Sequence, residues 1–300
     1  MPGFTTSDGV ALAVTERGPA DAEACAVLLH GWTEDASIWD GVTERLGDTM
    51  RVLALDLRGH GDSGPAPRSS ATIERLADDV AELIAALVPQ GRILLAGHSM
   101  GGMTMMALAE RHPELVERRV SGAVFVSTSA GQLRDVMSRM PAPIAAADRW
   151  QRRLARRTKA RRPQPTGESS ARGALPVPSK RLSRYVLRTV AFGERPDAAH
   201  VRAAVEQCAR THRSSAAGFN RSIMAHDRAR ALVAFAGVPT AVLVGDRDRL
   251  TPPAHAHVIA DALPDAEFVL FTRAGHMLPY ERPDGVASAI RAIARQHVTS

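Results

Sequence analysis

A serine at the tip of a small-residue turn is the side chain best placed for covalent chemistry. The apolar run Arg92–Ala96 predicts a buried parallel strand and the residues from Met100 onward predict a helix, so Ser99 lies where strand becomes helix. Gly97 and Gly101 flank it, as a tight, strained turn requires. The N–H groups at the start of the helix would stabilise an oxyanion there. The pattern favours nucleophilic catalysis, and a glycine-rich strand-to-helix connection is the structural alternative.

Two residues further along the chain provide what a nucleophilic serine needs. A serine hydroxyl is a poor nucleophile at neutral pH until a base removes its proton and a third group orients that base. Asp248 follows the predicted strand Thr240–Val244, and His276 follows the predicted strand Glu267–Phe271. Because parallel strands end at one edge of a sheet, both side chains are expected at the edge that carries Ser99.

The elements that would position these residues alternate between strands and helices. Continuous apolar runs predict strands covered on both faces, and amphipathic spacing predicts the helices. The predicted strands are Cys25–Leu29, Arg51–Leu57, Arg92–Ala96, Ala123–Ser127, Thr240–Val244 and Glu267–Phe271, after a hairpin at Phe4–Glu16. The predicted helices are Ser37–Leu46, Ile73–Val88, Pro253–Leu263 and Pro283–Arg295. This order predicts an α/β fold with a doubly wound, mostly parallel sheet.

The alternation is interrupted at residues 129–232. This stretch has helical spacing and a segment rich in Pro, Ser and Arg from Arg161 to Lys180, but no strand pattern of comparable quality. We therefore expect a helical cap at 129–232, inserted into a core of residues 1–128 and 233–300. A chain of 300 residues with 45% hydrophobic content can form one such core.

Five motifs together resemble those of alpha/beta hydrolase fold proteins. They are HGW at 30–32, DLRGHGDS at 56–63, GHSMGG at 97–102, GDRDRLTP at 245–252 and AGHMLPYERP at 274–283. The likeness covers Phe4–Ser127 and Pro239–Thr299 and leaves the insert as a cap without a motif of its own. The resemblance implies that Ser99 is the nucleophile, His276 the general base and Asp248 its orienting acid.

The resemblance also implies an oxyanion hole formed by the backbone N–H groups of Trp32 and Met100. Asp246 competes for the role of the acid, but the family pattern places the acid three residues after the glycine of GDRD, which favours Asp248. Some members carry the acid at the end of the strand before the cap, where Ser127 and its neighbours provide no carboxylate.

The serine narrows the reaction that the resemblance implies. Family members that act as dehalogenases or epoxide hydrolases carry an aspartate at this turn. We therefore expect a serine hydrolase that acts on a small-molecule carboxylic ester or thioester through an acyl-enzyme on Ser99, with no cofactor and no metal. The alternatives are a cofactor-free haloperoxidase or perhydrolase, a C–C bond hydrolase, and a non-catalytic ligand-binding protein. The fold does not identify the substrate, because the cap and the pocket walls determine it.

Other polar or flexible residues near these motifs are expected to be structural. His98 is expected to be packed or hydrogen-bonded rather than a second base. His255 and His257 lie two apart on a predicted helix, so they face different directions and make a poor metal pair. Met103 and Met106 are expected in the core, although thioethers can also line an acyl pocket. A structural turn is expected to contain Asp56, Arg58, His60 and Asp62.

Composition limits the compartment and the partners. Cys25 and Cys208 are the only cysteines, which argues against a disulfide framework or a cysteine zinc site. No apolar run long enough to span a membrane and no signal-peptide pattern are present, so a cytoplasmic protein is expected. The net charge is +6, but 36 of the 38 basic residues are arginine and only 4% of residues are aromatic. This favours a compositional origin over a nucleic-acid partner.

Positive charge is concentrated in Arg149–Arg188, where thirteen Arg or Lys residues accompany one acidic residue, Glu168. A basic cap of this kind could steer an anionic thioester or an acidic carrier protein to the site. A solvated, arginine-biased surface is the alternative, and the Pro and Ser content of Arg162–Ser179 favours it. Turnover that falls with salt for an anionic thioester, but not for a neutral ester, would indicate steering. The oligomeric state is not predicted.

Overall fold

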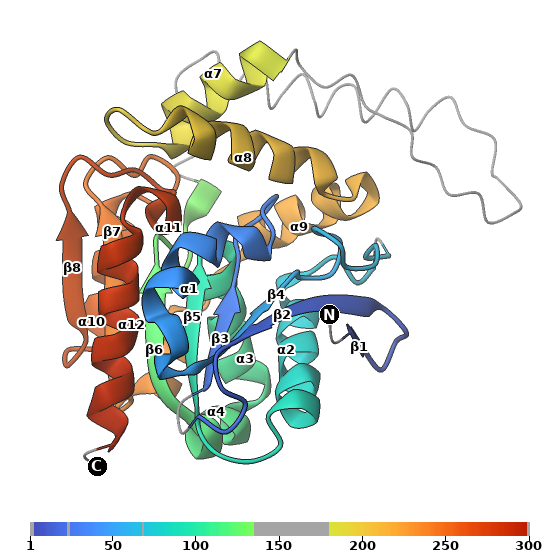
Figure 1. Cartoon of the computed structure of the whole chain (residues 1–300), viewed down its shortest axis with the longest axis vertical. Helices are drawn as coiled ribbons and strands as arrows, with labels where there is room; N and C mark the ends of the chain where they lie inside the picture. The colour runs from blue at the N-terminus through green and yellow to red at the C-terminus, as the bar shows by residue number, and fades with distance from the viewer. Residues whose placement is uncertain (1–2, 23–24, 68, 135–179, 299–300) are drawn as a thin grey trace, which may run out of the picture.

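A single sheet crosses the middle of the molecule between two layers of helices (Figure 1). The computed structural model describes residues 3–22, 25–67, 69–134 and 180–298. Within these residues eight strands follow the order β1-β2-β4-β3-β5-β6-β7-β8. They are β1 (Gly3–Thr5), β2 (Ala11–Arg17), β3 (Cys25–Leu29), β4 (Arg51–Leu55), β5 (Ile93–His98), β6 (Val120–Val126), β7 (Thr240–Gly245) and β8 (Glu267–Phe271).

Strand direction confirms the predicted doubly wound, mostly parallel sheet. β1 pairs with β2, and β2 with β4, in antiparallel fashion, which is the predicted N-terminal hairpin and its attachment to the sheet. Every other neighbouring pair, from β4·β3 to β7·β8, is parallel. The carboxyl ends of β3, β5, β7 and β8 therefore lie on one edge, which is the edge that carries the predicted site.

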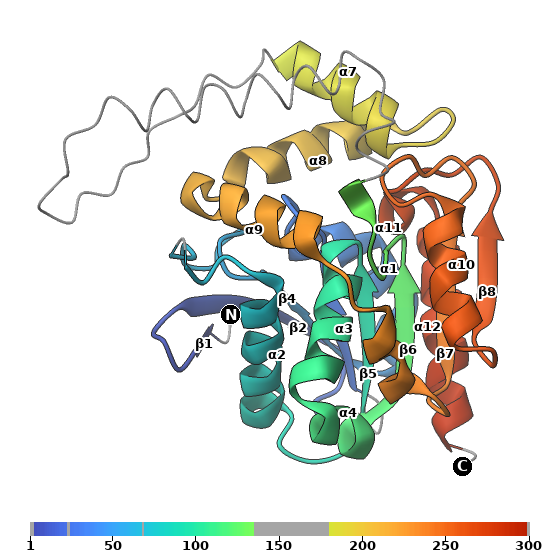
Figure 2. The same ribbon diagram turned by 180° about the vertical axis from the view of Figure 1, so that it is seen from behind.

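Helices cover both faces of this sheet (Figures 1 and 2). One face carries α2 (Ile73–Leu87), α3 (Met100–Arg111) and α10 (Pro253–Ala262), and the other carries α1 (Asp40–Leu46) and α12 (Pro283–Val298). Shorter elements connect them: η1 (Ala36–Trp39), η2 (Gly47–Thr49), α4 (Pro113–Arg119), η3 (Ala229–Phe235) and α11 (Leu278–Glu281). Of these, α4 and α11 were not expected from the sequence.

Burial on both faces explains the continuous apolar runs. In β3, Val27 and Leu29 pack in the cluster on the α2 and α3 side, whereas Ala26 and Leu28 pack in the cluster on the α1 and α12 side. All five residues of this strand are buried. Because successive side chains point to opposite faces, a strand covered on both sides needs an apolar residue at every position.

Three helices of the expected cap lie above the carboxyl edge of the sheet: α7 (Lys180–Ala191), α8 (Ala198–Arg210) and α9 (Arg213–Ala225) (Figure 1). The Pro-rich segment and most of the basic segment Arg149–Arg188 lie outside the described residues. The expected boundary at 232/233 falls inside η3, which packs against α3 and α10 of the core. The division into core and cap therefore stays a prediction.

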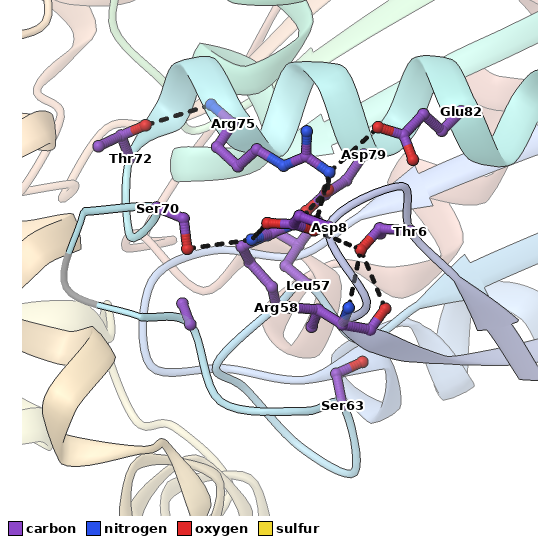
Figure 3. Close-up of polar contacts among 12 residues, drawn as sticks. Thr6, Asp8, Leu57, Arg58, Ser63, Ser70, Thr72, Arg75, Asp79 and Glu82 are labelled. Atoms are coloured by element: carbon purple, nitrogen blue, oxygen red, sulfur yellow. Dashed lines mark hydrogen bonds and ion pairs between the residues drawn. The ribbon is translucent and has the colours of Figure 1, made fainter.

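The turn after β4 is held by an ion-pair network around Arg58, whose side chain is fully buried (Figure 3). Arg58 donates through Nε and Nη2 to both carboxylate oxygens of Asp79 on α2, with an Nη2–Oδ1 distance of 2.6 Å. It donates through Nη1 and Nη2 to Asp8 of the N-terminal hairpin, at 2.9 Å each. In the same turn Asp56 accepts the backbone N–H groups of Ala36 and Asp62. The expected structural turn is confirmed.

Cys25 is buried in β3 and Cys208 lies on α8, and both are free thiols. None of the helices in the described ranges combines the length and the apolar character needed to cross a membrane.

Candidate active site

Ser99 lies in a strained turn between β5 and α3. Its φ of 50° and ψ of −113° place a non-glycine residue outside the usual regions, a conformation that the surrounding structure must impose. The backbone N–H of Ser99 donates to Val126 at 3.0 Å, and its carbonyl accepts the Thr128 hydroxyl at 2.6 Å. The backbone is thus anchored to the end of β6, while the side chain is only half-buried.

The glycines on either side allow this close approach. A Cβ on Gly97 would lie 2.5 Å from the backbone of Gly101 and Gly102, and a Cβ on Gly101 would lie 2.2 Å from the carbonyl oxygen of Leu29. Neither contact can be relieved by moving a side chain, because the opposing atoms are backbone. Helix α3 can therefore start directly against β3 and β5 only with glycine at these positions.

The structure brings Asp248 and His276 together at the same edge. Nδ1 of His276 donates to Oδ2 of Asp248 at 2.9 Å, and both residues are buried. Asp248 also accepts the backbone N–H groups of Leu250 at 2.9 Å and Thr251 at 2.8 Å, and the Thr251 hydroxyl at 2.9 Å. Burial opposes ionisation of Asp248, but His276 and these donors outweigh it and lower the pKa of Asp248 below its usual value.

The competing carboxylate does not share this setting. Asp246 is exposed, and its ion-pair partner is Arg247 at 3.9 Å. Of the two carboxylates after β7, Asp248 is the one that contacts His276. Because Nδ1 of His276 carries the hydrogen in this contact, Nε2 is left as the acceptor of the ring.

His98, the residue before Ser99 in the chain, contacts His276. Nε2 of His98 donates to the carbonyl oxygen of His276 at 2.9 Å, and the two rings lie 4.9 Å apart between centroids. Among the described residues, Ser99 and His276 form no direct hydrogen bond. Such contacts are often long before a substrate binds.

The two predicted oxyanion donors leave the sheet from neighbouring strands. β3 and β5 are paired in a register that aligns Leu29 with Gly97, so Trp32 and Met100 each lie three residues beyond this pair. Met100 is the first residue of α3, and its N–H is one of the groups that a helix cannot satisfy internally. In the described part of the chain, neither N–H donates a hydrogen bond to the protein. Both N–H groups are therefore suited to donate hydrogen bonds to an oxygen on which negative charge develops.

Comparison with known proteins identifies the family to which this fold belongs. Residues 27–283 match the alpha/beta hydrolase fold family. The chain belongs to the alpha/beta hydrolase fold family. A pimeloyl-(acyl-carrier protein) methyl ester esterase from Aromatoleum aromaticum is 28% identical over 280 residues, which span 90% of this chain and 97% of that protein. The corresponding esterase from Chromobacterium violaceum is 30% identical over 251 residues, which span 83% and 86% of the two chains.

A solved structure of similar shape is that of a thermophilic esterase from Thermogutta terrifontis. It superimposes with a TM-score of 0.75 at 27% identity and covers 99% of this chain and 98% of its own. Family and architecture thus agree with the resemblance carried by the five sequence motifs.

The structure of this alpha/beta hydrolase also places the residues expected to be structural. His98 is fully buried and hydrogen-bonded, as expected. Met103 and Met106 lie in the core. His255 contacts the Ser129 hydroxyl at 2.7 Å, whereas His257 stacks on Phe268, so the two histidines face different neighbours. These expectations are confirmed.

Two carboxylates of the loop after β3 were missed by sequence reasoning. Glu34 contacts His98 at 2.9 Å, and Asp35 accepts Gln207 at 3.1 Å and also binds Arg210, both from α8. Helix α8 is therefore attached to the loop that carries Trp32. The available signal was the position of two adjacent acidic residues just after a buried strand, at the edge that carries Ser99.

Proposed function

We propose that this alpha/beta hydrolase cleaves carboxylic esters through an acyl-enzyme on Ser99. The observation that supports this most strongly is the buried Asp248–His276 pair, at the same edge of the sheet as the strained Ser99 turn. A carboxylate that orients a histidine, together with a half-buried serine at a helix start, is the set of groups that acyl transfer requires.

The reaction follows from the roles of these groups. Oγ of Ser99 attacks the ester carbonyl carbon as its proton passes to Nε2 of His276, and the negative charge on the carbonyl oxygen is held by the N–H groups of Trp32 and Met100. Asp248 stabilises the imidazolium. His276 then gives the proton to the leaving oxygen as the C–O bond breaks, which releases the alcohol. A water molecule, deprotonated by His276, repeats the sequence on the acyl-enzyme and releases the acid.

The names of the relatives favour an ester over the other substrates on which proteins of this fold act. The two relatives described above are named as methyl ester esterases, and the solved structure described above is that of an esterase. At 27 to 30% identity these names support the bond type and not a particular acyl group. We therefore propose an acyl ester as the substrate class, with an acyl thioester as the related alternative.

The proposal is tested by Ser99→Ala with activated acyl esters of graded chain length and a fluorophosphonate label. We expect kcat to fall at least about a thousandfold and labelling to disappear, because the hole and binding contacts alone give only the residual rate. Ser129→Ala is the matched control, since Ser129 is a second serine in contact with a histidine but is fully buried. Labelling that persists in Ser99→Ala, or is lost in Ser129→Ala, would contradict the assignment.

A further inference from the structure

A buried carboxylate and imidazole connect three parts of the site. Oε2 of Glu34 accepts Nδ1–H of His98 at 2.9 Å and the backbone N–H of Gly31 at 2.6 Å. Nε2 of His98 donates to the carbonyl oxygen of His276 at 2.9 Å. The Glu34–His98 pair thus joins the loop after β3, the residue before Ser99, and the backbone of the proposed base.

With Glu34 ionised, the hydrogen bonds require a doubly protonated His98. A carbonyl oxygen only accepts, so Nε2 carries a hydrogen, and an ionised carboxylate only accepts, so Nδ1 carries one as well. His98 is then an imidazolium beside a carboxylate. Burial opposes the charge of both groups, but each partner outweighs it, so the pKa of Glu34 is lowered and the pKa of His98 is raised.

Glu34 also shapes the loop that carries Trp32. Its carboxylate folds back over Gly31, where an added Cβ would lie 2.7 Å from Oε2. The intervening residue Thr33 has a φ of 65°, an unusual conformation for a β-branched residue. The hydrogen bond from Gly31 to Glu34 closes this strained loop, and the proposed oxyanion donor Trp32 lies between the two residues in the chain.

The charge of this pair matters because His276 must become positive during acyl transfer. The His98 ring lies 4.9 Å from the His276 ring, so an unbalanced charge on His98 would oppose the imidazolium on His276. The other charged groups around His276 are Asp248, which contacts its ring, and Glu281 of α11, which accepts a backbone N–H of the same loop. Glu34 supplies the negative charge that balances His98.

We propose that Glu34 is a positioning residue: through His98 it fixes the backbone of His276, through Gly31 it fixes the loop that carries Trp32, and its charge balances a protonated His98. This inference rests on the proposed function, because it takes His276 and Trp32 as parts of the reaction. It adds a second buried carboxylate–histidine pair, which acts on the backbone of His276 while Asp248 acts on its ring.

The first test is Glu34→Gln, which keeps the shape of the side chain and removes its charge. We expect kcat per fluorophosphonate-titrated site to fall about ten- to a hundredfold, with KM changed by less than about threefold, because the base and the hole shift relative to Ser99. Glu34→Gln and His98→Asn together should cost about as much as the larger single change, since the pair acts as a unit.

The matched control is Asp79→Asn, which alters a buried carboxylate of the Arg58 network away from the site. It should lower Tm without changing kcat at temperatures well below Tm. If Glu34→Gln behaves like this control, with a lower Tm and an unchanged kcat, Glu34 is only structural and the proposal is wrong.

A second readout does not depend on turnover. In ¹⁵N-histidine NMR spectra at neutral pH, with His98 assigned from His98→Asn, both ring nitrogens of His98 should be protonated in the wild type and only one in Glu34→Gln. The Nδ1–H signal of His276 should also move in Glu34→Gln and stay in place in Asp79→Asn. A neutral His98 in the wild type would overturn this inference even if esters are hydrolysed. If the wild type shows neither ester turnover nor labelling, the proposed function is wrong instead.

Discussion

Two polar clusters of this molecule, each centred on a buried ion pair, are built from different charged groups. The frame cluster pairs Arg58 with Asp79 and Asp8, and the site cluster pairs His98 with Glu34 and His276 with Asp248. Arginine remains charged at any pH at which the protein is folded, so its five donors hold a fixed geometry. Histidine gains or loses a proton near neutral pH. Fixed charge thus holds the frame, and titratable charge is concentrated where proton transfer is proposed.

Backbone strain separates the same two regions. Within the described residues, positive φ values at non-glycine positions include Thr33, Ser99 and Ser127, at the carboxyl ends of β3, β5 and β6. Arg58, Asp79 and the rest of the frame cluster have none of these conformations. Strain of this kind persists only where the surroundings impose it. Backbone strain is therefore found in the site region and not at the residues of the frame cluster, so the two regions should respond differently to substitution.

The largest effect is expected from Asp248→Asn, which breaks the site cluster and spares the frame. The amide cannot stabilise the imidazolium and favours the wrong tautomer of His276, so kcat should fall about ten-thousandfold. Tm should fall as well, because the charge of the buried Asp248 stabilises the fold. Steady-state kinetics and thermal unfolding on the same samples measure both quantities.

Asp246→Asn is the control for this change, since Asp246 is exposed on the same loop and does not contact His276. It should leave kcat within about threefold of the wild type. A larger loss in Asp246→Asn than in Asp248→Asn would assign the acid to Asp246.

The second largest effect is expected from Arg58→Met, which breaks the frame cluster and spares the site. It leaves Asp79, with a side chain 1% exposed, without the guanidinium that contacts both of its oxygens. Removing one partner of a buried pair costs about 3 to 5 kcal/mol of unfolding free energy. Urea unfolding measures this loss, and kcat per labelled site well below Tm should be unchanged.

If Arg58→Met does not fold, Asp79→Asn provides the milder test of the same pair. A variant of either kind that keeps its stability and loses kcat would contradict the separation of frame and site.

Sequence reasoning identified strands and helices best where burial alone determines the pattern of apolar residues. β3 was predicted with the same bounds because both of its faces are covered. β5 was predicted to end at Ala96 but continues to His98, since its ladder with β6 runs on to the pair His98–Val126. Backbone hydrogen bonds extend a strand without any apolar signal. The helix α11 is only four residues long and shows no periodicity.

Site residues were predictable only where they lie in a local sequence motif. Ser99, Asp248 and His276 each follow a strand in a recognisable turn, and their roles stay predictions for the experiments above. The partners of Glu34 were not predictable, because His98 lies 64 residues from it and links it to His276, which lies 178 residues from His98. Contacts at such separations arise from strand order, which a single sequence does not reveal.

The smallest expected effect concerns the outer part of the frame cluster, at Asp8. The hydrogen bonds from Arg58 and Thr6, followed by the charges of Arg58 and Arg75, outweigh burial and hold the pKa of Asp8 well below its usual value of 3.8. A carboxyl with a lowered pKa in the folded state stabilises the fold above its unfolded pKa, and the stabilisation is lost as pH falls toward the folded value. The Asp8 side chain is 38% exposed, so solvent screens the effect and it should be smaller than that of Arg58.

We therefore expect Asp8→Asn to lower the unfolding free energy at pH 7, and the difference from the wild type to shrink as pH falls below about 4. Urea unfolding of both proteins at several pH values measures this difference. Every other carboxyl titrates in both proteins, so its contribution cancels when the two free energies are subtracted. If the Asp8 difference is constant or grows as pH falls, Asp8 is not held ionised by Arg58, and the frame cluster reduces to the Arg58–Asp79 pair.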